Sequence, residues 1–250
     1  MKINDIIEKL EKEFPKELAY EWDNVGLLVG DRDREVKTVV TCLDVTKDTI
    51  EFAKNAGAEL IISHHPVLFS PINRINGDTK TGRLLMDIIE NKIAVFSAHT
   101  NCDKAENGIN ARLAELFDLK DVEALEEDGL GRIGNLKEPM AFCQFAKLVE
   151  EKLSVKVRFC GDTKKTVSKV AICSGSGGDV LATAMEKGAD VLITGDTKYH
   201  QMLDSENDIN VIDAGHFGTE IIVTEIFAEI LCDMGIQVFW QDTEDVFKYL

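Results

Sequence analysis

The chain has 250 residues, of which 44% are hydrophobic and 29% are charged. This length fits one large domain or two modest ones, because domains usually hold roughly 100–200 residues. Acidic residues number 45 against 28 basic ones, which gives a formal net charge of −17. A surface this acidic repels a phosphate backbone, so we do not expect general nucleic-acid binding. The same negative charge favours the binding of multivalent cations.

The sequence carries no sign of export or membrane insertion. Its longest apolar runs, such as residues 58–63, fall well short of the roughly 20 residues that span a bilayer. The N-terminus turns acidic at Asp5 and lacks an apolar secretory region. Six cysteines lie far apart without a C-x-x-C pair, a pattern typical of reduced thiols. We therefore expect a folded cytoplasmic protein that does not enter a membrane.

Apolar spacing predicts alternating helices and strands in the first half. Ile3, Ile6, Ile7, Leu10 and Phe14 form one stripe of an N-terminal helix. Beyond it we expect strands at 38–43, 59–63 and 93–97, and helices at 46–55, 81–91 and 108–117.

The second half predicts the same alternation. We expect helices at 141–153, 179–187, 197–205 and 218–233, and strands at 169–173, 190–194, 209–213 and 236–240. Strands that alternate with helices favour the α/β class, with mostly parallel sheets covered by helices.

The two halves also resemble each other at an offset of 131 residues. Residues 57–63 align with 188–194, and Cys42 aligns with Cys173, where both thiols are expected to pack in cores. The sequence therefore predicts two related α/β domains, residues 1–127 and 128–250, joined within the acidic stretch 123–134. The C-terminal segment can pack back on the first domain.

Four of the five histidines lie in three loops, and each loop directly follows a predicted strand. His64 and His65 follow the strand at 59–63, His99 follows the strand at 93–97, and His216 follows the strand at 209–213. In open parallel sheets, ligands gather at the carboxyl ends of strands. We therefore expect a ligand site at the carboxyl ends of these strands.

Carboxylates accompany these histidines at a regular spacing. His99 and His216 are each followed four residues later by an acid, Asp103 and Glu220. Imidazole with carboxylate is the ligand set of Zn, Mn or Fe in hydrolytic sites. Two such pairs exceed the needs of one catalytic metal and favour two ions that share a bridging carboxylate.

The alternative for His64 and His65 is an ordinary polar loop. Two imidazoles at the end of a buried strand are costly unless something binds them, which favours the metal interpretation. His200 lies outside these loops and is expected to be a plain surface residue.

Other motifs leave two interpretations open. The glycine-rich stretch 174–178 opens a helix and can cradle a phosphate or be a turn without a ligand. Asp196 and Thr197 can cap a helix or contact a ligand. Asp23 precedes an apolar run flanked by glycines, as in a tight turn into a strand, and Cys102 is expected to be an inert thiol.

Five ordered motifs resemble those of the NIF3-like proteins, which are also called GTP cyclohydrolase 1 type 2 homologues. They are EWDNVGL at 21–27, SHHP at 63–66, HTNCD at 99–103, ITGD at 193–196 and AGHFGTE at 214–220. The resemblance runs from about residue 3 to residue 240. It implies the NIF3-like fold of two α/β domains, a toroidal homohexamer, and a dinuclear metal centre that faces the cavity of the toroid.

Carried onto these motifs, the resemblance implies two divalent ions, Zn, Fe or Mn, and five protein ligands: His64, His65, Asp103, His216 and Glu220. His65 and Asp103 are expected on one ion. His64 and His216 are expected on the other, and Glu220 bridges the two. His99 is expected beside the ions as the catalytic residue that carries a proton.

These expectations favour a metal-dependent hydrolase that acts on a nucleotide-like or phosphorylated small molecule. The alternative is a non-catalytic hexamer that binds metal and serves as a scaffold or regulator for a protein or nucleic-acid partner. A nucleic-acid partner is the weaker version, because the acidic chain has no cluster of Lys and Arg. Turnover by the metal-loaded protein distinguishes the two functions.

Overall fold

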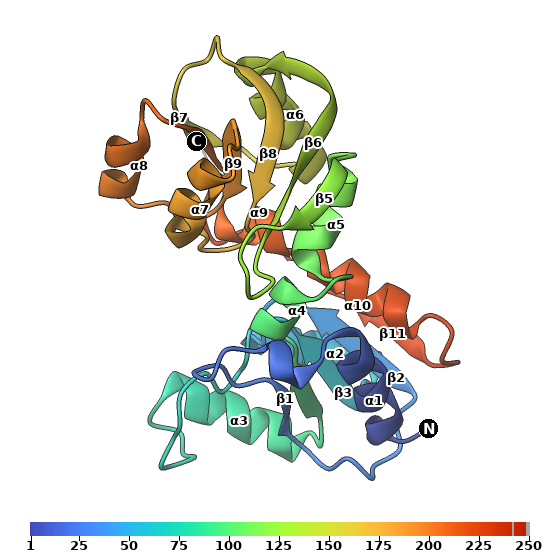
Figure 1. Ribbon diagram of the computed structural model, residues 1–250. Coiled ribbons are helices and arrows are strands. Elements are labelled where there is room, and N and C mark those ends of the chain that lie inside the picture. The colour runs from blue at the N-terminus through green and yellow to red at the C-terminus, as the bar shows by residue number, and fades with distance from the viewer. Residues whose placement is uncertain (242, 249–250) are drawn as a thin grey trace. The chain divides into compact units, whose positions relative to one another are not determined.

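The structure is a computed structural model that describes residues 1–241 and 243–248 (Figure 1). Its contacts divide the chain into two compact units. Unit 1 consists of Met1–Ala105 and Ile222–Glu244, and unit 2 consists of Glu106–Ile221 and the described residues that follow Glu244. The chain therefore passes between the units three times, whereas the sequence predicts a boundary at 127/128 and a C-terminal segment that can pack back on the first domain.

Unit 1 is built on a five-stranded sheet in the order β1-β4-β3-β2-β11. Strands β4, β3, β2 and β11 are parallel, and β1 is antiparallel at one edge. The strands are β1 (Gly26–Val29), β2 (Thr38–Cys42), β3 (Leu60–Ser63), β4 (Ala94–Ser97) and β11 (Gln237–Trp240). The helices are α1 (Ile3–Glu13), η1 (Lys16–Leu18), α2 (Lys47–Ala56), α3 (Lys80–Glu90), α4 (Thr100–Lys104) and α10 (Val223–Leu231).

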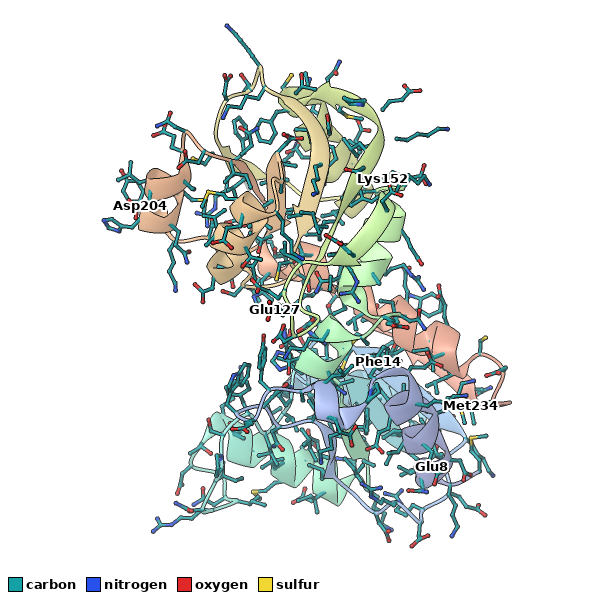
Figure 2. The ribbon with its side chains drawn as sticks, viewed as in Figure 1. Glu8, Phe14, Glu127, Lys152, Asp204 and Met234 are labelled. Atoms are coloured by element: carbon teal, nitrogen blue, oxygen red, sulfur yellow. The ribbon has the colours of Figure 1, made fainter. Side chains whose placement is uncertain are left out.

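Continuous burial explains the parallel core of this sheet. Every residue of β2, β3 and β4 is buried, as expected of strands that helices cover on both faces. Helix α1 adds the predicted apolar stripe, whose residues are all buried, whereas Glu8 on the same helix is exposed (Figure 2).

The segment 222–244 belongs to unit 1 because of long-range pairing. Strand β11 pairs in parallel with β2, with Gln237 opposite Thr38. On α10, the backbone oxygen of Thr224 accepts a hydrogen bond of 2.9 Å from Thr41 Oγ1. The ring of Phe227 packs edge-on against Phe14, labelled in Figure 2, with 5.8 Å between the centroids.

Unit 2 is built on a six-stranded sheet in the order β5-β6-β8-β9-β10-β7. The strands are β5 (Lys120–Ala124), β6 (Arg132–Ala141), β7 (Arg158–Cys160), β8 (Thr166–Ile172), β9 (Val191–Thr194) and β10 (Asn210–Asp213). The helices are α5 (Ile109–Leu116), α6 (Phe142–Leu153), η2 (Gly178–Val180), α7 (Leu181–Glu186), α8 (Tyr199–Ser205) and α9 (His216–Glu220).

The predicted repeat is present in the strand register. In unit 1, Val39 of β2 lies opposite Leu60 of β3. In unit 2, Val170 of β8 lies opposite Val191 of β9, which is the same pairing shifted by the predicted offset. The two units therefore share a βαβ core, and the prediction of an α/β fold with two sheets covered by helices is confirmed.

The second sheet is mixed rather than mostly parallel. Strands β8, β9 and β10 are parallel, but β5, β6 and β7 join antiparallel and were not predicted. The predicted joining stretch 123–134 contains the turn between β5 and β6, and both strands lie in unit 2. The predicted helix 218–233 is two helices, α9 and α10.

The described residues bear on membrane insertion and on the state of the cysteines. Among residues 1–241 and 243–248, no helix combines the length and apolar character needed to cross a bilayer. All six cysteines lie within these residues and are free thiols. Cys42 and Cys173 are buried in the two cores, as predicted.

We expect Phe227→Ala to destabilise unit 1, because it leaves a cavity against Phe14 where both rings are buried. Truncation of a buried Phe costs about 3–5 kcal/mol of unfolding free energy. Ile89→Ala on α3 is the control, since Ile89 is 51% exposed and its loss should cost less than about 0.5 kcal/mol. Urea denaturation followed by circular dichroism measures both. Equal midpoints for the two variants would contradict this packing.

Candidate metal centre

Three histidines of unit 1 converge where β3 and β4 end. His64 and His65 directly follow β3, and His99 follows β4 after one residue. The two strand ends are joined by a hydrogen bond of 2.8 Å between Ser63 Oγ and Ser97 Oγ. The three imidazoles each offer a ring nitrogen, and these atoms lie within 4.8 Å of one another. His64, His65 and His99 therefore lie together at the carboxyl ends of β3 and β4.

His64 is completely buried, and its orientation is set by the backbone. Its Nδ1 lies 2.8 Å from the carbonyl oxygen of Ala98. A carbonyl oxygen only accepts hydrogen bonds, so Nδ1 must carry the proton. In the neutral ring, Nε2 then holds the lone pair that a metal ion binds.

His65 and His99 are each held at Nδ1 by a carboxylate. Asp44 Oδ1 lies 2.8 Å from Nδ1 of His65, and Asp23 Oδ1 lies 2.9 Å from Nδ1 of His99. Metal-binding histidines characteristically donate their second ring nitrogen to a carboxylate or carbonyl, which fixes the tautomer and ring orientation. All three imidazoles of unit 1 thus have the outer contacts of metal ligands.

Asp103 lies beside His64. It belongs to α4, which begins immediately after His99, and it is only 8% exposed. The distance from Asp103 Oδ1 to His64 Nε2 is 3.6 Å. Ligand atoms that sit about 2.0–2.2 Å from one ion are separated by roughly this distance in a tetrahedral site. The arrangement is compatible with a cation held by both groups.

Unit 2 carries the second imidazole–carboxylate pair on α9. This helix follows β10 after two residues, and the spacing of four residues places His216 and Glu220 on the same face. His216 Nε2 lies 2.9 Å from Glu220 Oε2, and the carboxylate is buried. Nδ1 of His216 lies 2.7 Å from Asp196 Oδ2. His216 therefore repeats the pattern found for the unit 1 histidines.

Asp196 occupies the position in the second repeat that His65 occupies in the first. The offset of 131 residues places one on the other, and each follows its strand by two residues. Asp196 is not a helix cap, because α8 begins at Tyr199 and its N-cap is Lys198. A close approach brings Asp196 to His216: a Cβ on Gly195 would lie 2.6 Å from the backbone carbon of Gly215.

The glycine-rich stretch 174–178 serves the protein itself and is not a phosphate cradle. Its amides donate to internal oxygens, including Gly175 N to Thr219 Oγ1 at 2.9 Å and Gly177 N to Thr194 Oγ1 at 2.9 Å. Gly175 has a positive φ of 61°, and a Cβ there would lie 2.1 Å from Glu220 Oε1. Glycine at 175 therefore leaves room for the carboxylate of Glu220.

Exposed aromatic rings adjoin His99. Trp22 is 58% exposed and Phe69 is 52% exposed, and each ring centroid lies 6.3 Å from that of His99. The two rings are 5.8 Å apart, and Tyr20 stacks on Trp22. The histidines of unit 1 are thus bordered by an apolar surface.

Sequence reasoning did not identify the carboxylates that orient the histidines. Asp196 carried a usable signal, since it aligns with His65 in the repeat. Asp44 lies two residues after β2, at the same sheet edge as the other strand ends. No sequence pattern linked Asp23 to His99, because the two residues are 76 positions apart and the sequence around Asp23 predicted only a turn. His200 is exposed, as predicted.

We expect Gly175→Ala to weaken the binding of a divalent cation, because the new methyl group displaces the buried carboxylate of Glu220. The expected loss is about tenfold, as for other changes next to a metal ligand. Gly188→Ala is a matched control: Gly188 also has a positive φ, 73°, but a Cβ there meets no described atom within 4 Å. Calorimetric titration with Zn²⁺ or Mn²⁺ measures both, and equal affinities would contradict the role of Gly175.

The contacts of Asp23 predict a pH dependence. Burial raises the pKa of its carboxyl, but hydrogen bonds from His99 and Thr100 outweigh burial and lower the pKa from 3.8 to about 2. The unfolded chain has the higher pKa, so ionised Asp23 stabilises the fold above about pH 4, and this stabilisation is lost as the pH falls toward 2.

We therefore expect the stability difference between the wild type and Asp23→Asn to shrink as the pH falls from about 4 to 2. Glu21→Gln, in the same loop and exposed, controls for the loss of one negative charge. Urea denaturation at a series of pH values measures the difference. A constant difference over this range would rule out the stabilising contact.

Known proteins resemble the chain over its whole length. The family model Duf34/NIF3 (NGG1p interacting factor 3) matches residues 1–245. Relatives called GTP cyclohydrolase 1 type 2 homolog include one from Clostridium perfringens, 38% identical with full coverage of both chains, and one from Methanocaldococcus jannaschii, 37% identical over 92% of this chain and 95% of its own.

Solved structures agree with these matches. A hypothetical protein of Staphylococcus aureus superposes with a TM-score of 0.92 at 28% identity, covering 100% of this chain and 99% of its own. Reduced HcgD from Methanocaldococcus jannaschii superposes with a TM-score of 0.87 at 33% identity, covering 97% and 98%. Because the family model covers residues 1–245 and the relative from Clostridium perfringens is 38% identical over the full length, the chain belongs to the Duf34/NIF3 family.

Proposed function

We propose that this protein is a divalent-metal-dependent hydrolase that acts on a nucleotide-like or phosphorylated small molecule. One observation carries the proposal: each of the four strand-end histidines has its Nδ1 within 2.9 Å of an oxygen atom. This contact orients each ring and leaves Nε2 as the nitrogen that a metal ion binds. Relatives named GTP cyclohydrolase 1 type 2 homolog support testing nucleotides first.

We assign the ligands of two ions to five side chains. The 3.6 Å separation supports placing His64 and Asp103 on one ion. His65, His216 and Glu220 would be the remaining ligands that the family resemblance implies. The resemblance itself pairs Asp103 with His65, whereas the separation within unit 1 favours His64 as its partner. Nitrogen and carboxylate donors suit Zn, Fe or Mn, and a bound pair of such ions supplies Lewis acidity and activates water near neutral pH.

His99 is assigned the transfer of a proton. Its Nδ1 is held by Asp23, so Nε2 is the atom that accepts the proton and returns it. Imidazole suits this role because its unperturbed pKa lies near neutrality. The exposed rings of Trp22 and Phe69 border His99 and can shield it from water or contact a planar substrate.

We also propose that the chain assembles into a homohexamer that forms a toroid. Exposed apolar side chains support association of copies: edge strand β11 presents Phe239, 41% exposed, and Trp240, 56% exposed. An unpaired sheet edge with apolar side chains is a usual contact surface between chains. Light scattering after size exclusion measures the mass.

Metal content and turnover test the function together. We expect about two equivalents of divalent metal per chain after purification without added metal, and at least one equivalent fewer in His64→Ala or His216→Ala. His200→Ala is the control, because His200 is exposed and outside the strand-end loops. The metal-loaded wild type should hydrolyse at least one member of a panel of nucleotides and phosphoesters.

Each part of the proposal has its own contradicting result. Less than one equivalent of metal in the wild type, unchanged in His64→Ala, rejects the metal centre. Two equivalents without turnover of any panel member rejects the hydrolase and favours a metal-binding scaffold. Retention of activity in His99→Gln with intact metal content rejects its role in proton transfer.

A further inference from the structure

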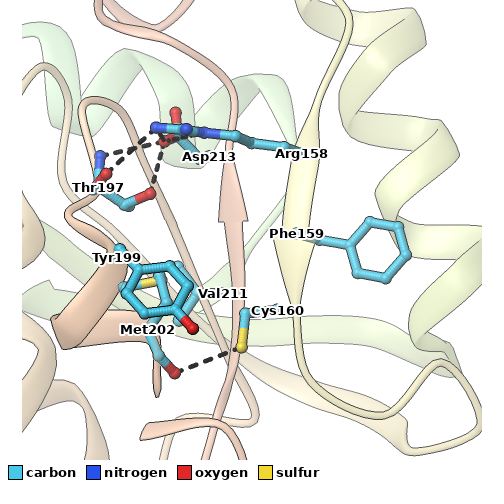
Figure 3. Close-up of a pocket in the computed structure, with 8 residues that line it drawn as sticks. All are labelled: Arg158, Phe159, Cys160, Thr197, Tyr199, Met202, Val211 and Asp213. Carbon is cyan, nitrogen blue, oxygen red and sulfur yellow. Dashed lines mark hydrogen bonds and ion pairs between the residues drawn. The ribbon is translucent and has the colours of Figure 1, made fainter. Parts of the chain in front are cut away.

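Unit 2 has a pocket beside edge strand β7, with a volume of about 190 Å³ (Figure 3). One end is polar and contains Arg158 and Asp213, which lie opposite each other on β7 and β10. The other end contains Tyr199, Met202 and Val211. A pocket with one charged end and one apolar end suits a small molecule with the same division.

The guanidinium group of Arg158 is held in place although its side chain is 72% exposed. Its Nε and Nη2 donate to Asp213 Oδ2 at 2.9 and 2.7 Å, and Nη2 also donates to the Thr197 oxygen at 3.2 Å (Figure 3). Across residues 1–241 and 243–248, no group accepts a hydrogen bond from Nη1. This nitrogen therefore remains able to donate to an anion in the pocket.

Arg158 is not needed only to neutralise and bind Asp213, because Asp213 has other hydrogen-bond donors. The buried carboxylate of Asp213 also accepts hydrogen bonds from Thr197 N, Thr197 Oγ1 and Gly215 N, so Arg158 is one of several partners. An arginine fixed in its bound orientation loses little side-chain entropy when a ligand arrives. Hydrogen bonds from a guanidinium group to phosphate are strong because both partners are charged, and Nη1 has two N–H groups that can donate.

The apolar end is lined by side chains that suit contact with an aromatic ring. Val211 forms a buried wall, Met202 is half-buried, and the ring of Tyr199 is 74% exposed beside the opening. A cavity of about 150 Å³ accommodates a benzene-sized molecule, so this pocket is large enough for a single ring. Stacking on Tyr199 and contact with the Met202 thioether favour a flat aromatic group.

A second cavity of about 350 Å³ lies beside this pocket. It shares Arg158 and Asp213 with the first, and His216 and Asp196 also line it. Arg158 therefore stands between the ring-sized pocket and His216. The charged side chains that line the second cavity are Arg158, Lys248, Asp196, Asp213 and Asp245, and Asp213 is paired with Arg158.

We propose that unit 2 binds a phosphorylated molecule that contains a planar aromatic or heteroaromatic ring. The ring lies against Tyr199 and Met202, and the phosphate accepts hydrogen bonds from Nη1 of Arg158 on the side of His216. This assignment rests on the proposed hydrolase function, because it gives the substrate of that function its binding site. It makes Arg158 a residue that positions the phosphate and Tyr199 a residue that selects for a ring.

Phenyl phosphate is the probe, and inorganic phosphate and phenol serve as its two halves. Calorimetry on the full-length protein measures affinity before and after removal of divalent ions, which separates binding at Arg158 from binding at metal. The ¹³C-labelled methyl group of Met202 reports on the pocket by NMR. We expect phenyl phosphate to bind more tightly than either half in the metal-free protein and to shift the Met202 methyl signal.

Variants divide the two ends of the site. Arg158→Met should weaken phenyl phosphate about tenfold or more and leave phenol nearly unchanged, because a charge-assisted hydrogen bond is lost. Arg158→Lys keeps the charge beside Asp213 and should give an intermediate affinity, which guards against misfolding as the cause. Tyr199→Ala should weaken phenyl phosphate and phenol but not inorganic phosphate. Leu203→Ala is the control, because Leu203 lies on the same helix, is 51% exposed and does not line the pocket.

Three results would overturn the assignment. These are equal affinity of Arg158→Met and wild type, a Met202 signal that does not shift, and a change of oligomeric mass in Tyr199→Ala that shows the pocket to be covered by another copy. If the protein binds metal and turns over substrate, and Arg158→Met changes neither phenyl phosphate affinity nor turnover, this site is rejected while the hydrolase function stands. Phenyl phosphate bound at Arg158 in a protein that binds no metal rejects the hydrolase, while the site itself stands.

Discussion

The candidate metal centre depends on one repeated interaction, a hydrogen bond from Nδ1 of each strand-end histidine to a protein oxygen. The backbone carbonyl of Ala98 supplies one such oxygen, and Asp23, Asp44 and Asp196 supply the others. A histidine held at Nδ1 can offer only Nε2 to a metal ion. The hydrogen bond at Nδ1 therefore fixes the direction in which Nε2 points. Without these contacts, four imidazoles would be flexible polar groups at the ends of apolar strands.

The βαβ repeat explains how these groups reach the same kind of position twice. Parallel strands in matching register end at one edge of their sheet, so the residues that follow β3 and β4, or β9 and β10, become neighbours. The repeats have diverged in chemistry at one position. His65 in the first repeat is aligned with Asp196 in the second, where a carboxylate orients His216. The same position of the repeat thus carries the imidazole of His65 in unit 1 and, in unit 2, the carboxylate of Asp196 that orients His216.

Buried carboxylates in both units are stabilised by several hydrogen-bond donors. Asp23 receives hydrogen bonds from His99 and from the amide and hydroxyl of Thr100. Asp213 receives them from Arg158, Thr197 and Gly215, and these donors lower the pKa of its carboxyl more than burial raises it. Each ionised carboxylate therefore fixes a neighbouring cationic or imidazole group. Asp23 in this way holds His99 next to exposed aromatic rings, and Asp213 holds Arg158 at the edge of the pocket.

The sequence by itself determined the α/β class, the parallel cores, the repeat and the candidate ligands, because buried strands and helix faces leave a local apolar period and the histidines follow strand ends. Only the tertiary structure decided the rest. Strands β5 and β7 are largely exposed edge strands without that period, so they escaped prediction. The segment 222–244 joins unit 1 because β11 pairs with β2, and Asp23 meets His99 across 76 residues. Such contacts depend on which distant segments pair, and no local pattern records that choice.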